Sequence, residues 1–266
     1  MSSLEKAMHR TEAFPPPLIQ FRDFSFSYKG QELFDKLDLD LTTGCWNLLL
    51  GRSGVGKTSL LKALAGLLPD KNYSGEILFG GKKLAPDQVS WMTQDDLLLP
   101  WLSVLENSLL GNRLRAWNRS PSPPIAIQEA EALLWNLGLG RHLDKRPAEL
   151  SGGMRQRVAL ARTLLEDRPV VLLDEPFSAL DALTRNEMQN LAYEQLMHKT
   201  VIMITHDPRE ALRLGHHIYL LKGSPVQLTR IIPPEEAPPR AGFSAELQSC
   251  EDQIIAELTL SGETAK

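Results

Sequence analysis

The chain has 266 residues, of which 42% are apolar and 23% are charged, an ordinary balance for a globular protein with one large domain or two small ones. Its net charge of −4, without any block of basic residues, does not indicate nucleic acid as a partner. The two cysteines, Cys45 and Cys250, form no metal-binding spacing and suggest a reducing compartment without a disulfide framework.

Neither a membrane helix nor a secretion signal is predicted. No stretch reaches the roughly 18 apolar residues that a spanning helix needs. Residues 1–17 carry charges throughout and lack the apolar segment of a signal peptide. If the protein acts at a membrane, we therefore expect it to dock onto another subunit.

Alternating and continuous apolar residues predict strands in the first third of the chain. The expected strands cover residues 19–28, 37–41, 46–50 and 89–92. The alternation slips near Asp23, which indicates a β-bulge. A helix over residues 59–68 is expected to stop at Pro69, and Gly80 with Gly81 marks a turn between strands.

The middle of the chain is predicted to be helical and the last third to alternate. Two helices are expected over residues 103–117 and 127–137, with a Pro- and Ser-rich surface loop between them. Strands at 170–173, 200–204 and 218–221 then alternate with helices at 181–197 and 208–214. Such alternation implies a mostly parallel sheet with helices on its faces, interrupted here by an inserted helical block.

The string from Gly51 to Thr58 matches the phosphate-binding pattern GxxxxGK-S/T, directly after an apolar strand and directly before a helix. Glycines let backbone N–H groups converge on phosphate oxygens, and the helix start adds partial positive charge. Lys57 would reach the β- and γ-phosphates, and Thr58 would ligate Mg²⁺. The strand–loop–helix setting argues against a chance match on a glycine turn. The predicted nucleotide-binding residues here are Gly51, Arg52, Ser53, Gly54, Val55, Gly56, Lys57, Thr58 and Ser59.

Two carboxylates follow the fully apolar strand at residues 170–173. Ligands of open α/β sheets bind beyond the carboxyl ends of the strands. Asp174 can hold Mg²⁺, directly or through water, and Glu175 can orient or deprotonate the attacking water. The alternative is a solvated strand end, but the phosphate loop in the same chain favours the catalytic interpretation.

A second anion-binding device precedes that strand. Ser151 is a good N-cap residue, and Gly152 and Gly153 let the backbone approach a ligand closely. Because one chain binds one nucleotide, the economical explanation is that this device serves the nucleotide of a partner chain. A capped helix after a turn is the plain alternative.

These motifs occur in the order found in the nucleotide-binding subunits of ATP-binding cassette (ABC) transporters, which the chain resembles from Tyr28 to His206. The resemblance implies an α/β fold: a P-loop NTPase core with a mixed sheet, an antiparallel β subdomain and an inserted α-helical subdomain at about 95–165. The ATPase domain is expected at 17–230, followed at 231–266 by a Pro-rich spacer and an amphipathic C-terminal helix. The resemblance also implies a head-to-tail homodimer that sandwiches two ATP molecules. Each phosphate loop would then face the LSGG segment of the other chain.

The resemblance assigns further roles residue by residue. Tyr28 occupies the place of an aromatic that stacks on adenine, although a strand aromatic in the core is an alternative. Gln94 matches a glutamine that senses Mg²⁺ and the attacking water, and Asp181 lies in a segment that communicates across the dimer. His206 matches a histidine that contacts the γ-phosphate. Met154, directly after LSGG, stands where many relatives carry glutamine.

The segment at residues 97–107 and the string LSGGMRQR resemble the importer branch for nitrate, sulfonate, taurine and thiamine precursors. In that branch, Leu98, Leu99, Pro100 and Trp101 would line the groove for a membrane subunit, or else form local core of the helical subdomain. The implied function is that of an Mg²⁺-dependent ATPase at the cytoplasmic face of the membrane. It would power uptake through separate permease subunits, supplied indirectly by a solute-binding protein. A soluble assembly scaffold of the iron–sulfur type is an alternative, and an exporter subunit separated from its membrane domain is another.

Overall fold

A six-stranded sheet forms the centre of the molecule. The computed structural model describes residues 19–69, 71–116, 124–242 and 244–260. The order across this sheet is β10-β9-β3-β8-β7-β6. Its parallel strands are β6 (Val89–Met92), β7 (Val170–Asp174), β8 (Thr200–Thr205), β3 (Trp46–Gly51) and β9 (His217–Lys222), and β10 (Gln227–Ile231) runs antiparallel to β9. The alternation of strands and helices therefore correctly predicted a mostly parallel sheet.

The three central strands are buried at every residue because both faces of the sheet are covered. Along β3, Leu48 and Leu50 belong to one apolar cluster and Leu49 to the cluster on the opposite face. The first cluster continues into the helical subdomain, where it includes Val104 and Leu134. The two cores therefore meet only through the sheet that separates them.

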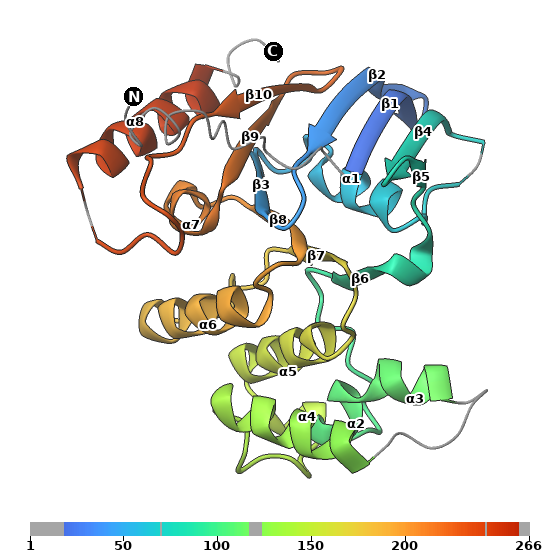
Figure 1. Cartoon of the computed structure of the whole chain (residues 1–266), viewed down its shortest axis with the longest axis vertical. Coiled ribbons are helices and arrows are strands. Elements are labelled where there is room, and N and C mark those ends of the chain that lie inside the picture. Colours follow the sequence, from blue (N-terminus) through green and yellow to red (C-terminus); the bar gives the residue numbers. More distant parts are fainter. Residues whose placement is uncertain (1–18, 70, 117–123, 243, 261–266) are drawn as a thin grey trace, which may run out of the picture.

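A smaller antiparallel sheet packs over α1 (Lys57–Leu64), as Figure 1 shows. Its order is β2 (Gln31–Leu41), β1 (Ile19–Tyr28), β4 (Tyr73–Phe79) and β5 (Lys82–Lys83). The register of β1 shifts between Phe21 and Phe24, and Asp23 has a φ of 47°. The N–H of Asp23 donates to Oδ1 of Asp38 at 3.0 Å. The predicted bulge is thus confirmed, with a side chain of the neighbouring strand satisfying its exposed donor.

The first helix is shorter than predicted. The pattern predicted residues 59–68, whereas α1 starts at Lys57 and ends at Leu64. Gly66 has a φ of +68°, and the N–H of Leu67 donates to the carbonyl of Lys62 at 2.8 Å. This left-handed glycine cap ends the helix before Pro69 can do so.

The predicted helix over 103–117 is two helices, α2 (Val104–Ser108) and α3 (Leu110–Ala116). Ser103 and Glu106 form a capping box at the start of α2. Asn107 is fully buried, and its side-chain amide donates to loop carbonyls of Leu99 and Leu102. Polar side chains bonded to the backbone in this way compete with helical continuation, which explains the break near Leu109.

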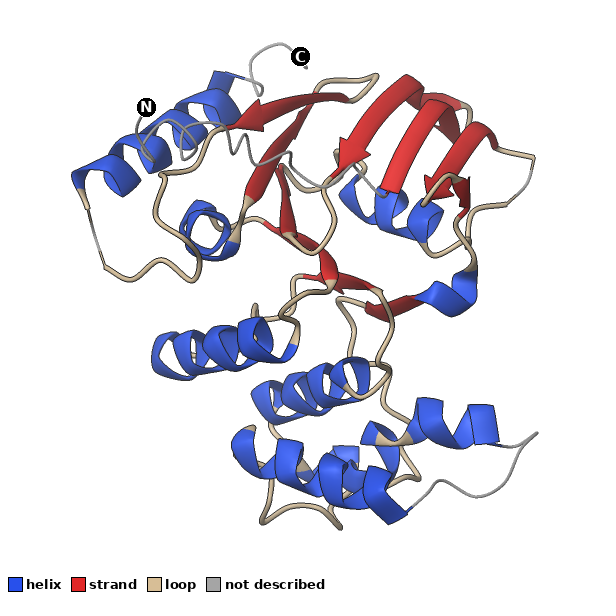
Figure 2. Ribbon diagram, viewed as in Figure 1, coloured by secondary structure: helices blue, strands red, loops and turns tan. Residues whose placement is uncertain are grey.

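The helical subdomain is completed by α4 (Pro124–Asn136) and α5 (Gly152–Leu164), and Figure 2 shows these helices gathered at one end of the molecule. Two short 3₁₀ helices lie at Pro86–Gln88 and Pro147–Glu149. Helix α6 (Ala182–Gln195) follows β7, and α7 (Pro208–Leu214) follows β8. No helix among the described residues combines the length and the hydropathy that crossing a bilayer requires.

The chain ends in α8 (Ala245–Leu260), which lies close to α7 (Figure 1). Ile254 of α8 is completely buried, and Glu257 forms an ion pair with Lys222 of β9. The Pro-rich segment before the helix is held by Arg240, of which only 4% is exposed. The predicted C-terminal helix is therefore present and packs against the α/β core.

Candidate functional site

The phosphate loop joins the end of β3 to the start of α1. Gly54 and Gly56 have φ values of +83° and +113°, a backbone region that L side chains rarely adopt. A Cβ atom at Gly56 would also meet a methyl carbon of Leu33 at 3.0 Å. Two glycines of the motif are thus required by local geometry, independently of any ligand.

Lys57 is buried under this loop, with 7% of its surface exposed. Its Nζ donates to the carbonyl oxygens of Gly51 at 2.7 Å and Arg52 at 3.0 Å. Burial lowers the pKa of Lys57, and the carboxylates of Glu175 and Asp174 oppose that shift. The partners of Lys57 are thus neutral loop carbonyls, which a phosphate would replace as the stronger acceptor.

Thr58 and Asp174 bring the phosphate loop and the end of β7 together. The Thr58 hydroxyl donates to Oδ2 of Asp174 at 3.0 Å. Burial raises the pKa of Asp174, and the hydrogen bond from Thr58 acts in the opposite direction. A hydroxyl and a carboxylate are the oxygen ligands that Mg²⁺ prefers, with phosphates and water completing its shell. No group of three or more His, Cys, Asp or Glu side chains within the described residues could hold a metal by itself.

Glu175 stands in a strained turn after β7. Its φ is 50°, which costs a non-glycine residue about 1–3 kcal/mol. Its N–H donates to the carbonyl of Ile204 at 3.0 Å. Oε2 lies 3.2 Å from Nδ1 of His206, whose side chain is 63% exposed. The turn directs the carboxylate toward a histidine that solvent or a ligand can reach.

A cavity of about 440 Å³ lies between these elements, a volume suitable for a small-molecule ligand. It brings together Tyr28, the glycine loop, Gln94, Asp174 and Glu175. Ten predicted residues line it: Tyr28, Ser53, Gly54, Gly56, Lys57, Thr58, Ser59, Gln94, Asp174 and Glu175. Tyr28 is 56% exposed, so its ring is not a core residue, which was the alternative left open by the sequence.

Leu33 and Ile204 also line this cavity and were not predicted. Leu33 comes from β2, and no motif marks an apolar residue of that strand as a ligand contact. His206 borders a smaller neighbouring cavity that it shares with Glu175. The sequence thus predicted the polar residues around the cavity and missed the apolar ones.

The second anion-binding device does not line the cavity of its own chain. The Ser151 hydroxyl accepts a hydrogen bond from the N–H of Met154 at 3.3 Å and caps α5. Gly152 and Gly153 follow in the first turn. Asp181 likewise caps α6, and the bond that it accepts from the N–H of Thr184 lowers its pKa. Ser151, Gly152, Gly153 and Asp181 are all absent from the lining of the cavity described above.

Gln156, one turn further along α5, connects that helix to the loop after Glu175. Its side chain is buried and donates to the carbonyl of Glu175 at 3.1 Å and to the Ser178 hydroxyl at 3.3 Å. Its Oε1 accepts from the N–H of Ala179 at 2.9 Å. Apart from its position within LSGGMRQR, nothing in the sequence marks Gln156 for this role.

The segment after Gln94 is held on α5 by arginines. Arg155 pairs with the carboxylate of Asp96 at 2.9 Å, and Arg162 donates to the carbonyls of Asp96 and Leu97. Beyond these anchors, Leu97 is 61% and Trp101 is 65% exposed. Leu98 instead packs against the hydrophobic core. Among the four residues expected in the groove, Pro100 and Trp101 are exposed, while Leu98 and Leu99 are half-buried.

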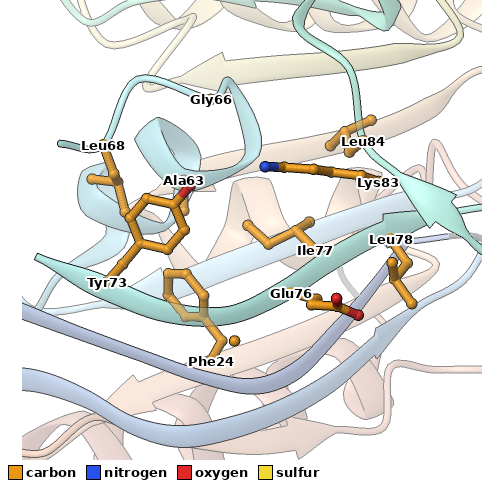
Figure 3. A pocket seen from close by; sticks show the side chains of 11 residues that line it. Phe24, Ala63, Gly66, Leu68, Tyr73, Glu76, Ile77, Leu78, Lys83 and Leu84 are labelled. Carbon is orange, nitrogen blue, oxygen red and sulfur yellow. The ribbon is translucent and has the colours of Figure 1, made fainter. Parts of the chain in front are cut away.

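A separate cavity of about 210 Å³ lies between α1 and the antiparallel sheet (Figure 3). Phe24 and Tyr73 line it with ring centroids 6.2 Å apart, and Lys83 extends toward it from the other side. None of its lining residues belongs to the predicted site.

Comparisons with known proteins agree with this geometry. The family described as "ABC transporter" matches residues 34–178. An uncharacterised ABC transporter ATP-binding protein of Haemophilus influenzae is 40% identical over 91% of this chain and 98% of its own length. The aliphatic sulfonates import ATP-binding protein of Delftia acidovorans is 44% identical over 77% of this chain and 79% of its own.

Among solved structures, the inward-facing conformation of a putative metal-chelate type ABC transporter superposes with a TM-score of 0.66. It is 26% identical in sequence, over 80% of this chain and 83% of that one. The expected P-loop NTPase core, mixed sheet and inserted helical subdomain are thus confirmed.

Proposed function

Because the chain belongs to the ABC transporter family, as the ATP-hydrolysing subunit of a bacterial importer, we propose that it powers uptake of an organic sulfonate. The curated import relatives carry the name "aliphatic sulfonates import ATP-binding protein". Nitrate and thiamine pyrimidine precursors are the other substrates expected from the sequence. The relatives likewise favour an importer over an iron–sulfur assembly scaffold.

The cavity that joins the phosphate loop to Asp174 and Glu175 supports a specific division of labour. Lys57 exchanges its two loop carbonyls for the β- and γ-phosphates of ATP. Thr58 and Asp174 would hold Mg²⁺, which would neutralise phosphate charge. Tyr28 would stack on the adenine ring, and Gln94 would contact the metal and the attacking water.

Glu175 is the general base. Its carboxylate accepts a proton from the attacking water, and His206, 3.2 Å away, contacts the γ-phosphate and steadies that carboxylate. Substituting such a base lowers kcat by about 10²–10⁴-fold.

We infer that the active site is completed by a second copy of the chain. Ser151, Gly152 and Gly153 form an N–H-rich helix start with no ligand of their own chain to serve. A head-to-tail homodimer would place this segment against the γ-phosphate held by the partner, with Asp181 at the contact. ATP can drive closure because it contacts both chains only in the closed state.

Permease subunits dock on the segment after Gln94, where Leu97, Pro100 and Trp101 are exposed. Large exposed apolar side chains on a helical subdomain are typical of an interaction site. The ATPase would then lie peripherally on the cytoplasmic face of the membrane, with a solute-binding protein delivering substrate on the other side.

The substrate is tested by deleting the gene and supplying sulfur as an alkanesulfonate or as sulfate. The deletion strain should fail to grow on the sulfonate and grow normally on sulfate. Wild-type protein should restore growth, and Glu175→Gln should not. Normal growth of the deletion strain on several sulfonates, with loss of nitrate or thiamine-precursor uptake instead, would contradict the proposed substrate.

A further inference from the structure

A second large cavity lies under the C-terminal segment, between α6, α7 and the start of α8. Its volume is about 390 Å³, and four arginines line it: Arg185, Arg209, Arg213 and Arg240. It shares no lining residue with the nucleotide cavity. Nothing in the proposed ATPase mechanism uses it.

Two of the arginines are neutralised by carboxylates. Arg209 pairs with Glu251 at 2.7 Å, and Arg185 lies 3.7 Å from Asp207. The only other carboxyl group in the lining is that of Glu210, which accepts a hydrogen bond from Gln189 at 2.9 Å. Burial raises the pKa of Glu210, and its side-chain hydrogen bonds oppose that shift.

Arg240 has no carboxylate partner among the described residues, although only 4% of it is exposed. Its guanidinium donates to the carbonyls of Leu212, Gly215 and Pro234, at 2.6, 2.9 and 3.0 Å. Its Nε is buried and has no hydrogen-bond partner within the described residues. Leu212 and Gly215 lie at the C-terminal end of α7, where helix carbonyls offset part of a positive charge, but they do not replace a carboxylate.

Arg213, which contacts Arg240, is also bonded only to neutral acceptors among the described residues. Its three nitrogen donors reach the side-chain oxygens of Gln189 and Asn190 and the carbonyl of Arg240, at 2.9, 2.5 and 2.8 Å. All three acceptors are neutral. Burial lowers the pKa of both arginines, and for Arg240 the charge of Glu236 only partly opposes that shift.

The alternative is that both arginines merely hold the C-terminal segment in place. That explains their hydrogen bonds to carbonyls, but it leaves the buried charge of Arg240 beside the half-buried charge of Arg213, and neither has a carboxylate at ion-pair distance among the described residues. Buried charges are costly unless they are paired. Arginine is also the side chain that best matches the geometry of oxyanions.

We propose that the cavity bordered by Arg213 and Arg240 binds a small oxyanion, either free sulfate or phosphate or the head group of an organic sulfonate. The bound anion supplies the negative charge that the lining lacks. Arg185, Asp207 and Glu210 also line the small cavity beside Glu175 and His206, so the ligand would lie next to the hydrolytic site. The site does not depend on which substrate the transporter carries.

The test is calorimetric titration of the full chain with sulfate, phosphate and ethanesulfonate, each against chloride at equal ionic strength. Saturating Mg-ADP is present throughout, because the phosphate loop would otherwise bind the same anions. We expect saturable binding. A tighter constant for ethanesulfonate than for sulfate would identify an organic ligand, and the reverse order an inorganic one.

Two variants of α6 distinguish binding in this cavity from a general effect of added negative charge. Asn186 lines the cavity and is exposed, whereas Gln195 lies on the same helix outside the lining. Asn186→Glu should weaken binding at least roughly threefold by repulsion, and Gln195→Glu should leave it unchanged. Absence of saturable binding in the wild type, or equal weakening by both variants, would overturn the proposal.

Discussion

Replacing Gln156 by leucine should slow ATP hydrolysis without impairing nucleotide binding. The change keeps the buried volume nearly constant and removes three hydrogen bonds to the loop after Glu175. The carbonyl of Glu175 retains a bond from the Ser178 hydroxyl at 3.0 Å. The main loss is therefore the acceptor for the N–H of Ala179.

The size of the effect follows from the surroundings of that N–H. An unsatisfied buried donor costs about 1–3 kcal/mol. Ala179 is exposed, so water can partly replace the lost acceptor of its N–H. The cost should therefore lie near about 1 kcal/mol, the lower end of this range. If about 1 kcal/mol of restraint on Glu175 is lost in the transition state, kcat falls about fivefold.

The assay compares kcat, ADP affinity and urea unfolding for the wild type, Gln156→Leu and Gln156→Glu. The glutamate variant can still accept from the N–H of Ala179 and loses only the bonds that Gln156 donates, so its kcat should fall less than that of Gln156→Leu. Gln156 does not line the nucleotide cavity, so ADP affinity should stay unchanged in both variants. A folded Gln156→Leu protein with wild-type kcat would refute the reasoning.

Three further outcomes are expected. Glu175→Gln should lower ATPase activity by about 10²-fold or more and stabilise an ATP-dependent dimer in gel filtration; a variant that hydrolyses at the wild-type rate would remove Glu175 as the base. Burial and Arg230 lower the pKa of His217 from 6.5 to about 4. The unfolded chain therefore binds a proton that the native chain does not, and stability should fall as pH decreases between these values. His217→Gln should remove about 2–3 kcal/mol of the fall in the free energy of unfolding over this pH interval, as measured by urea unfolding at several pH values. An unchanged pH dependence would contradict the assignment. Trp101→Glu should abolish co-purification with the permease while leaving the ATPase activity of the isolated subunit intact, and normal co-purification would argue against this docking surface.

The polar half of the nucleotide site could be predicted because each of its motifs sits at the end of a strand or in the turn after it. Strands β3 and β7 are separated in the sheet only by β8, so the phosphate loop and Asp174 emerge at the same edge. Parallel strands bring their carboxyl ends together whatever lies between them in sequence. The β-bulge at Asp23 could be predicted as well, because the break in the alternation of apolar residues is local to that strand.

Other features were not predicted correctly. Helix α1 ends earlier than predicted because the left-handed Gly66, and not Pro69, terminates it. The break near Leu109 follows from the burial of Asn107, whose side chain bonds to carbonyls of the loop just before α2. Arg213 and Arg240 meet only because the C-terminal segment folds back over α7, which composition and periodicity do not reveal.

The left-handed backbone at Glu175 has a consequence for how this chain can evolve. Glycine would occupy the same turn without the steric cost that glutamate bears there. Selection for heat resistance alone would therefore favour Glu175→Gly, and each such gain would discard the carboxylate on which turnover depends. Stability and activity compete at this one position, so thermostable variants of the enzyme should be sought by changes elsewhere in the chain.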